Sequence, residues 1–313
     1  MVISSYIKKY IPNNIEDINL ETNDINSLNF MISNKNIYNL IILGNSGVGK
    51  SCLANIIYKK YYSDISNIEL INNNILNVNI LIEDGISYYR NDVKNFCNTC
   101  SRIKNYKKIL IIDYIDIISD QSQLIIKNYI EEYSNTVLFV LILQDINKIN
   151  NSIINNCDII NIKNPDYNFL LKILVKINEN EKLNIDETTF NDIIFESKYN
   201  IPCLINNLQK IHLSNNINEF IDINKYKTYI QYCKNIDYIN SIDHILNIYD
   251  NGINLIDILC QLNEYLKLSN DIETDIKYNL IKITIKYINK CHNNNDDKTE
   301  LIFITNNFII IFI

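Results

Sequence analysis

A glycine-rich segment, Gly44–Ser51 (GNSGVGKS), follows an apolar run rich in β-branched residues, Ile37–Leu43, and precedes a helical pattern, Ser51–Tyr62. The segment fits G-x-x-x-x-G-K-[ST] in the strand–loop–helix context that this motif requires. In such a loop the backbone N–H groups turn toward phosphate oxygens, and the N-terminus of the following helix favours negative charge. Three of the 5 glycines of the chain lie in this one loop, which argues against a chance turn. The segment predicts a phosphate-binding loop.

The side chains of the loop predict its ligands. Lys50 would contact the β and γ phosphates of ATP, and the hydroxyl of Ser51 would be a ligand of Mg²⁺. The other residues of the loop would surround the phosphates with backbone groups. We therefore expect nucleotide contacts at Gly44, Asn45, Ser46, Gly47, Val48, Gly49 and Cys52.

Two further apolar runs end in polar residues. Lys108–Ile112 is followed by Asp113, and Thr136–Leu143 is followed by Gln144. Strands of this kind, separated by helix-length segments, are typical of a parallel sheet with both faces covered. Asp113 suits the Walker B position, where a carboxylate holds the Mg²⁺ shell together with Ser51. Without the upstream loop, an ordinary acidic residue at a strand end would be the better interpretation.

The second half of the chain has a different pattern. From about Pro165 onward, stretches such as Asn168–Asn180 and Tyr249–Leu268 carry apolar residues at helical spacing, with no strand-like alternation between them. This half is predicted to be all helical, in two parts.

The amino-acid composition limits which binding partners and which cellular compartment we expect. The abundance of Asn, Ile, Lys and Tyr is typical of an AT-rich genome, and Arg90 and Arg102 are the only arginines. With a net charge of −7, the whole protein does not attract nucleic acid, so DNA contact would need a local basic stripe or partner subunits. The 8 scattered Cys and the lack of a secretory signal predict a reduced, intracellular compartment. Leu301–Ile313 is too short to span a bilayer, so we expect a soluble protein with no membrane partner.

Four stretches together resemble the small subunits of replication factor C, which are AAA+ sliding-clamp loader subunits. Tyr6–Leu20 (YIKKYIPNNIEDINL) is similar to their opening box, and Lys108–Cys157 follows their run from Walker B to the S-R-C motif. Ile205–Gln209 (INNLQ) is similar to their lid-helix signature. Asn247–Leu262 resembles their pair of collar helices, with Gly252 at the turn.

The resemblance implies an α/β AAA+ P-loop module with a parallel sheet in residues 1–164, a small helical lid in 165–225 and an all-helical collar for ring assembly in 226–313. It also adds Ile7 and Ile11 as nucleotide contacts. The implied function is that of an ATP-binding subunit that helps to load a sliding clamp onto primed DNA. Its partners would be other loader subunits, the clamp and primer–template DNA, in a nucleus or at a viral or cytoplasmic replication site.

The chain departs from the family at four positions. Walker B reads Asp113-Tyr114-Ile115-Asp116 instead of D-E-A-D, so the carboxylate that would activate the attacking water is missing. Gln144 replaces the sensor-1 Asn, and its longer side chain could still place an amide at the nucleotide, so it stays an expected nucleotide contact. Asn156 replaces the Arg of S-R-C, and Pro202 aligns with the sensor-2 Arg. The nucleotide site is therefore predicted to bind ATP and to hydrolyse it poorly.

A basic stretch, residues 90–108, carries six positive side chains against Asp92 alone. Arg90 and Lys94 are one helical turn apart and share a face. In the family this helix tracks the DNA backbone, and Lys127 aligns with another such position, so we expect phosphate contacts there. The alternative is a solvated surface.

Two other functions stay open at this stage. The chain could be a non-hydrolysing structural subunit of the loader ring, with ATP as a structural ligand. It could also be another AAA+ DNA-replication ATPase, such as an initiator or a Holliday-junction motor.

Cys97 and Cys100 form a C-x-x-C pair, but no second pair lies at zinc-ribbon spacing, so a metal site is not expected.

Overall fold

The structure is a computed structural model that describes residues 5–313 except 81–85, 184, 186, 198, 215–222, 270–271 and 293–296. By its internal contacts the chain divides into two compact units, residues 1–215 and 216–313. The three-part division at residues 164 and 225 stays a prediction, and the three helices after the sheet belong to the first unit.

The first unit is built on a five-stranded parallel sheet with the strand order β2-β3-β4-β1-β5. Its strands are β1 (Leu40–Leu43), β2 (Ile75–Asn79), β3 (Lys108–Asp113), β4 (Val137–Leu143) and β5 (Asp158–Asn161). The predicted parallel sheet is thus confirmed. In the register, Leu43 of β1 pairs with Leu143 of β4, and Asp113 of β3 pairs with Ile142 of β4. The carboxyl ends of these three strands therefore meet at one edge, which is where ligands bind in open α/β sheets.

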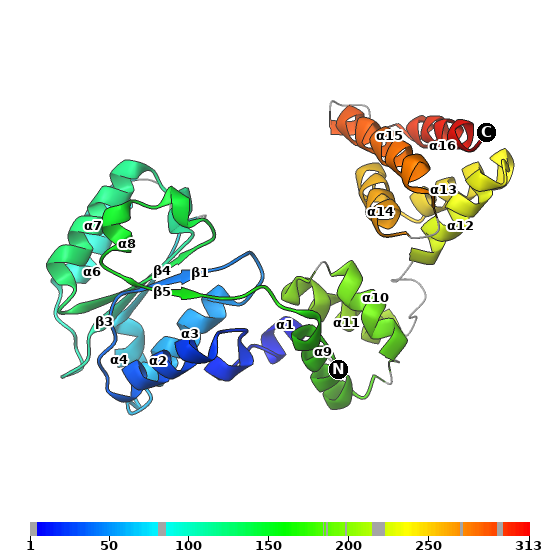
Figure 1. The fold of residues 1–313 in the computed structure, drawn as a ribbon. Helices are drawn as coiled ribbons and strands as arrows, with labels where there is room; N and C mark the ends of the chain where they lie inside the picture. The colour runs from blue at the N-terminus through cyan, green and yellow to red at the C-terminus, as the bar shows by residue number, and fades with distance from the viewer. Residues whose placement is uncertain are drawn as a thin grey trace. The chain divides into compact units, whose positions relative to one another are not determined.

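Helices cover both faces of this sheet (Figure 1). Along β4, Leu138, Val140 and Ile142 belong to one core cluster, while the intervening residues belong to another. This alternation follows from the two-residue period of a strand, and because both faces are buried the strand is apolar throughout. The first face is covered by α2 (Thr22–Ser33), α3 (Lys50–Tyr61) and α4 (Ile68–Asn73). The second is covered by the π-helical turn η2 (Tyr89–Val93), α6 (Lys94–Asn98), α7 (Asp120–Tyr133) and α8 (Asn151–Ile154).

Three helices complete the first unit after the sheet: α9 (Tyr167–Glu181), α10 (Glu187–Glu196) and α11 (Ile201–Ser214). We call them the lid helices. The short helix α1 (Tyr6–Lys9) packs on α11. The remaining short elements are η1 (Ile15–Asp17), α5 (Ile86–Tyr88), η3 (Ile115–Ile117) and η4 (Ile146–Lys148).

The second unit consists of helices, as predicted. They are α12 (Ile223–Lys234), α13 (Tyr238–Asp250), α14 (Leu255–Leu268), α15 (Thr274–His292) and α16 (Thr299–Phe312). Gly252 adopts φ +88° in the turn between α13 and α14, a conformation that suits glycine. The C-terminal apolar stretch forms α16, whose Leu301, Ile304 and Phe308 are buried in the core of this unit. Across the described residues no helix is long and apolar enough to cross a membrane.

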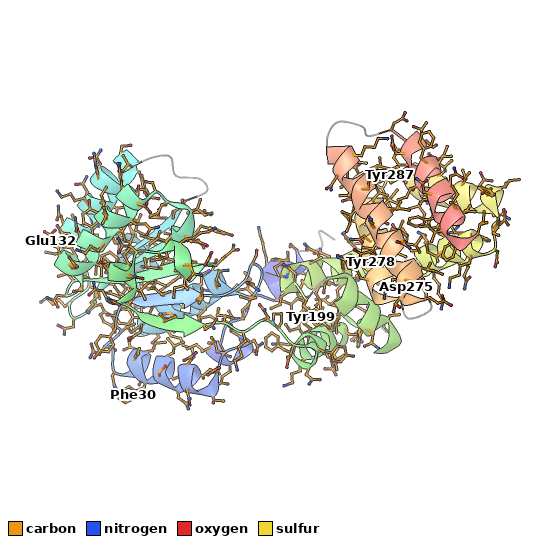
Figure 2. All side chains as sticks on the ribbon, turned by 45° about the horizontal axis from the view of Figure 1, so that its top comes forward. Phe30, Glu132, Tyr199, Asp275, Tyr278 and Tyr287 are labelled. Atoms are coloured by element: carbon orange, nitrogen blue, oxygen red, sulfur yellow. The ribbon has the colours of Figure 1, made fainter. Side chains whose placement is uncertain are left out.

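Aromatic side chains also lie on the surface of both units. Phe30 on α2 is 69% exposed and Tyr278 on α15 is 70% exposed (Figure 2).

Candidate nucleotide-binding site

The glycine-rich loop connects β1 to α3, as the sequence predicts. Gly47 has φ +78° and Gly49 has φ +102°, so both lie in the left-handed region. A residue with a Cβ would be strained there, and the two glycines allow the backbone to curl before the helix begins. Gly49 directly precedes Lys50, the first residue of α3. The loop therefore directs its N–H groups and the N-terminus of a 12-residue helix toward one point.

Lys50 lies inside this loop. Its Nζ donates to the carbonyl oxygens of Gly44, at 2.8 Å, and Asn45, at 2.7 Å, and the residue is only 8% exposed. Burial lowers the pKa of Lys50, and the carboxylates of Asp113 and Asp116 oppose that shift. A cation with two carbonyl acceptors and two nearby acids is thus held where phosphate oxygens would compete for its protons.

The hydroxyl of Ser51 donates to Oδ2 of Asp113 at 2.8 Å. Ser51 lies in the first turn of α3 and Asp113 at the end of β3, so two segments distant in the sequence are joined at the sheet edge. A hydroxyl and a carboxylate are hard oxygen donors of the kind that Mg²⁺ prefers. The pair predicted to hold the metal is therefore close together beside the loop.

Asp116 takes part in this edge in a way that the sequence analysis did not predict. Its Oδ2 accepts the backbone N–H groups of Gln144, at 3.1 Å, and Asp145, at 3.2 Å. Its Oδ1 is buried and has no hydrogen-bond partner among the residues that the structure describes. The carboxylate therefore ties the segment after β3 to the segment after β4. In the sequence, the position of Asp116 as the second acid of the D-x-x-D pattern could have pointed to this role.

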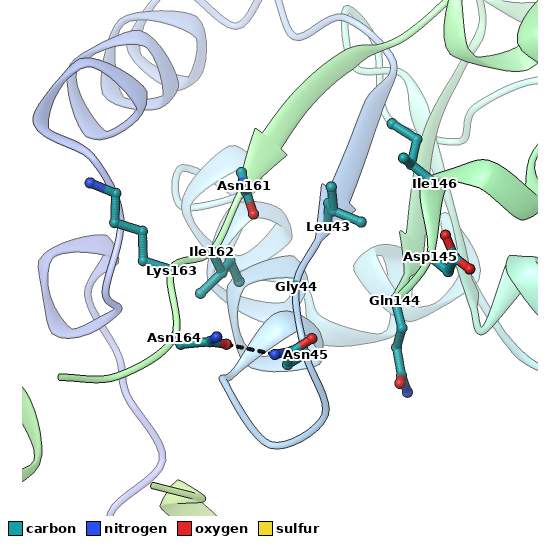
Figure 3. A pocket seen from close by; sticks show the side chains of 10 residues that line it. All are labelled: Leu43, Gly44, Asn45, Gln144, Asp145, Ile146, Asn161, Ile162, Lys163 and Asn164. Carbon is teal, nitrogen blue, oxygen red and sulfur yellow. Dashed lines mark hydrogen bonds between the residues drawn. The ribbon is translucent and has the colours of Figure 1, made fainter.

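A pocket of about 360 Å³ lies at the carboxyl ends of β1, β4 and β5 (Figure 3). Asn45 Nδ2 donates to Asn164 Oδ1 at 2.9 Å, and both residues line the pocket. Gln144 is exposed and extends past the end of β4 on the same side as the loop (Figure 3). The residues that line the pocket are Leu43, Gly44, Asn45, Gln144, Asp145, Ile146, Asn161, Ile162, Lys163 and Asn164.

Residues 40–164 match the model of the AAA family, described as "ATPase family associated with various cellular activities". Two mimivirus (Acanthamoeba polyphaga mimivirus) proteins named as replication factor C small subunits are 31% and 28% identical over 218 and 205 residues. Replication factor C subunit 4 of Schizosaccharomyces pombe is 26% identical over 291 residues, which cover 88% of this chain and 82% of that protein. The chain is thus similar to replication factor C small subunits, and its first unit contains an AAA-family domain. The mimivirus alignments cover 66% of this chain and 61% and 62% of those relatives, about three fifths of their length.

In this replication factor C-like chain, α1 is attached to the lid helices. The backbone N–H of Tyr6 donates to Gln209 Oε1 at 3.0 Å, and the buried Tyr6 hydroxyl is hydrogen-bonded to His212. Burial, followed by the charge of Glu181, raises the pKa of Tyr6 to about 12. Ile7 and Ile11, the two expected nucleotide contacts from the opening box, are 36% and 41% exposed. Their side chains are thus available to a ligand.

Glu181, at the end of α9, holds α1 through charge. Its Oε1 accepts from Lys9 Nζ at 2.5 Å and from the Tyr10 hydroxyl at 2.6 Å. The hydrogen bond from Lys9, followed by the one from Tyr10, lowers the pKa of the Glu181 carboxyl. A carboxyl with a lowered pKa stabilises the fold above its unfolded-state pKa, roughly 4.3, and that contribution disappears as the pH falls through the folded-state value.

We expect Glu181→Gln to destabilise the first unit by about 1 kcal/mol at pH 7, because a half-exposed ion pair and one charged acceptor are lost. The difference between variant and parent in urea unfolding should become smaller as the pH is lowered from 7 to 3. Glu179→Gln, on the same helix, is the control. An equal difference at both pH values would mean that the charge of Glu181 does not hold α1.

The side chains of the basic stretch, residues 90–108, separate into two groups. Arg90 and Lys94 are exposed on η2 and α6. Lys108 is buried, and its Nζ donates to the backbone oxygen of Phe96 at 2.5 Å and to Thr99 Oγ1 at 2.6 Å. Lys107 Nζ donates to the carbonyl oxygen of Ser134 at 3.0 Å. The last two lysines of the stretch therefore serve the fold.

Lys127, the third expected DNA contact, is half-buried on α7 and forms an ion pair with Glu131 at 3.0 Å, one turn away. Its charge is thus partly balanced by Glu131.

Two departures from the family pattern have clear positions. Asn156, in place of the S-R-C arginine, is exposed and donates from Nδ2 to the Ser152 carbonyl oxygen at 2.8 Å. Pro202, in place of the sensor-2 arginine, is exposed in the first turn of α11. Cys97 of the C-x-x-C pair is buried, and burial raises the pKa of its thiol to about 12. Within the described residues, no group of three or more His, Cys, Asp and Glu side chains could hold a metal ion.

Proposed function

We propose that this chain is an ATP-binding subunit of a sliding-clamp loader that binds ATP with Mg²⁺ and hydrolyses it poorly or not at all. The observation that carries the proposal is the convergence of Lys50, Ser51 and Asp113 at the carboxyl edge of the sheet, within a domain that matches the AAA family. Lys50 would exchange its two carbonyl acceptors for phosphate oxygens. The Ser51 hydroxyl and the Asp113 carboxylate would hold the metal shell.

Two departures from the family pattern support the expectation that hydrolysis is poor. Tyr114 replaces the family's water-activating carboxylate and lies at φ +65°, in the left-handed region. Its phenol cannot accept a proton from water at neutral pH. Asn156 is a neutral amide, so it could not neutralise charge on a phosphate of a neighbouring subunit. The structural-subunit alternative differs from the main proposal only in whether ATP is ever turned over.

The proposed partners follow from the family and from the exposed basic face. Relatives named as replication factor C subunits support a hetero-oligomeric ring. Mass spectrometry of the proteins that co-purify with the tagged chain tests this. Recovery of further AAA+ subunits and a sliding clamp is the expected result. A chain that purifies alone, or only with junction-processing proteins, would contradict the loader assignment.

We propose that Arg90 and Lys94 contact DNA phosphates, since both are exposed and one helical turn apart. The double change Arg90→Ala, Lys94→Ala should weaken DNA binding by the assembled complex without changing its sequence preference. Each lost phosphate contact should flatten the log–log salt dependence by roughly 0.9. Fluorescence anisotropy with primed DNA at several salt concentrations measures the slope.

The matched control is Lys282→Ala, Lys286→Ala, which removes two exposed lysines one turn apart on α15. Its slope should equal that of the parent. If the two double variants behave alike, the face formed by Arg90 and Lys94 is a solvated surface.

A further inference from the structure

A lid residue lies directly against the phosphate-binding loop. A Cβ added to Gly47 would lie 2.8 Å from Cγ and 3.0 Å from Oδ1 of Asn200, and closer still to Nδ2. Real Cβ atoms do not approach other atoms so closely, so the Asn200 carboxamide packs on the Cα of Gly47. Asn200 immediately precedes α11, and its neighbour Tyr199 marks this part of the lid in Figure 2. The loop and the lid, distant in sequence, thus meet at one side chain.

Asn200 is held in a defined orientation. Its backbone N–H donates to the Ser197 carbonyl oxygen at 2.9 Å, and its carbonyl oxygen accepts from Leu204 N–H at 3.0 Å. Its Oδ1 accepts the backbone N–H of Cys203 at 3.1 Å, which is the N-cap hydrogen bond of α11. An N–H donor needs an acceptor, so this bond also assigns which carboxamide atom is oxygen. The Nδ2 group, a donor, is therefore the end nearest to Gly47.

The chemistry of the position matches a phosphate. Both arginines of the chain lie elsewhere, at positions 90 and 102, and Pro202 has neither a charged side chain nor an N–H. The Cys203 and Leu204 N–H groups already bond to Asn200, so the Asn200 Nδ2 group is the side-chain donor that this end of α11 places beside the loop. It lies at the N-terminus of a 14-residue helix, which favours negative charge.

We propose that Asn200 is a nucleotide-binding residue, and that its Nδ2 donates a hydrogen bond to a phosphate oxygen of the ATP held in the loop. The inference rests on the proposed ATP binding. It adds a contact from the lid helices, through which a bound nucleotide holds the lid against the loop. Because α1 is hydrogen-bonded to α11, the same contact links the nucleotide to the N-terminal segment.

Asn200→Asp tests this contact selectively. Aspartate caps a helix as well as asparagine does, so the hydrogen bond from Cys203 N–H is retained. The donor that faces the loop becomes a carboxylate oxygen, which repels phosphate. We expect at least about a tenfold loss of ATP affinity in calorimetric titrations of the full chain. Thermal unfolding without nucleotide should match the parent.

Asn206→Asp is the matched control, because it adds the same charge at an exposed position of the same helix and should bind ATP as the parent does. Asn200→Ser, which keeps a cap but shortens the side chain, should also lose affinity, and it replaces the aspartate variant if that protein unfolds. Parental affinity in both Asn200 variants would overturn the Asn200 contact alone, provided that the parent binds ATP and Lys50→Ala does not. A parent that binds no ATP would overturn the proposed function as well.

Discussion

Replacing Lys50 with alanine should reduce ATP affinity by at least about 100-fold, because the phosphates would lose two charge-assisted hydrogen bonds worth roughly 1.5–3 kcal/mol each. In the structure, Nζ of Lys50 already has two carbonyl acceptors inside the loop, at 2.7 and 2.8 Å. The ammonium group is thus placed at the centre of the loop. No other lysine or arginine lies among residues 44–51 to replace it. Isothermal titration calorimetry with ATP and Mg²⁺ measures the change.

Lys59→Ala is the control for this experiment, since Lys59 is exposed at the far end of the same helix. It should bind ATP like the parent. The Lys50→Ala protein must also show a normal thermal transition, because the carbonyl oxygens of Gly44 and Asn45 lose their donor. Equal affinity of a folded Lys50→Ala variant and the parent would remove the basis for the phosphate-loop assignment.

The purified chain should bind ATP but hydrolyse it at close to the background rate, and Tyr114→Glu should raise that rate by at least about tenfold. A positioned general base contributes typically ~10²–10⁴-fold, and a glutamate following Asp113 would supply one. Tyr114 follows the carboxylate that hydrogen-bonds to Ser51, so the new carboxylate would be presented beside the proposed metal. Single-turnover hydrolysis of radiolabelled ATP measures the rate.

Tyr114→Phe is the matched control and should stay at background, because it removes only the hydroxyl. Adding Asp113→Asn to Tyr114→Glu should abolish the gain, since the metal shell would lose its carboxylate. Rapid hydrolysis by the parent, lost in Asp113→Ala, would instead mean that another carboxylate serves as the base. Asp116 is then the residue to test, because its buried Oδ1 has no partner in the described part of the chain and its charge acts on Lys50.

Much of the nucleotide site was predictable because its signals are local. Gly47 and Gly49 mark positions where only glycine turns without strain, and the apolar run before them requires a buried strand. The ends of parallel strands meet at one edge of a sheet, so Asp113 could be placed near Ser51 before any distance was known. The helical second half also followed from periodicity alone.

Tertiary structure decided which charged and polar side chains face the solvent and which serve the fold. Lys107 and Lys108 belong to the same basic stretch as Arg90 and Lys94, yet their ammonium groups donate to backbone oxygens. Lys108 is the first residue of strand β3, and Lys107 directly precedes it. Sequence charge is counted per residue, whereas burial depends on neighbours far along the chain.

The contacts of the lid were equally hidden. Asn200 and Gly47 are separated by most of the first unit, and Tyr6 is buried among residues of α11. No local sequence pattern predicts either contact. An asparagine before a helix predicts only an N-cap, and a tyrosine in a short helix predicts only that one face of the helix is apolar. The sequence by itself determined the loop, the strands and the acids at their ends, because these depend on backbone conformation and periodicity. The packing of the lid helices alone decided what else reaches the loop.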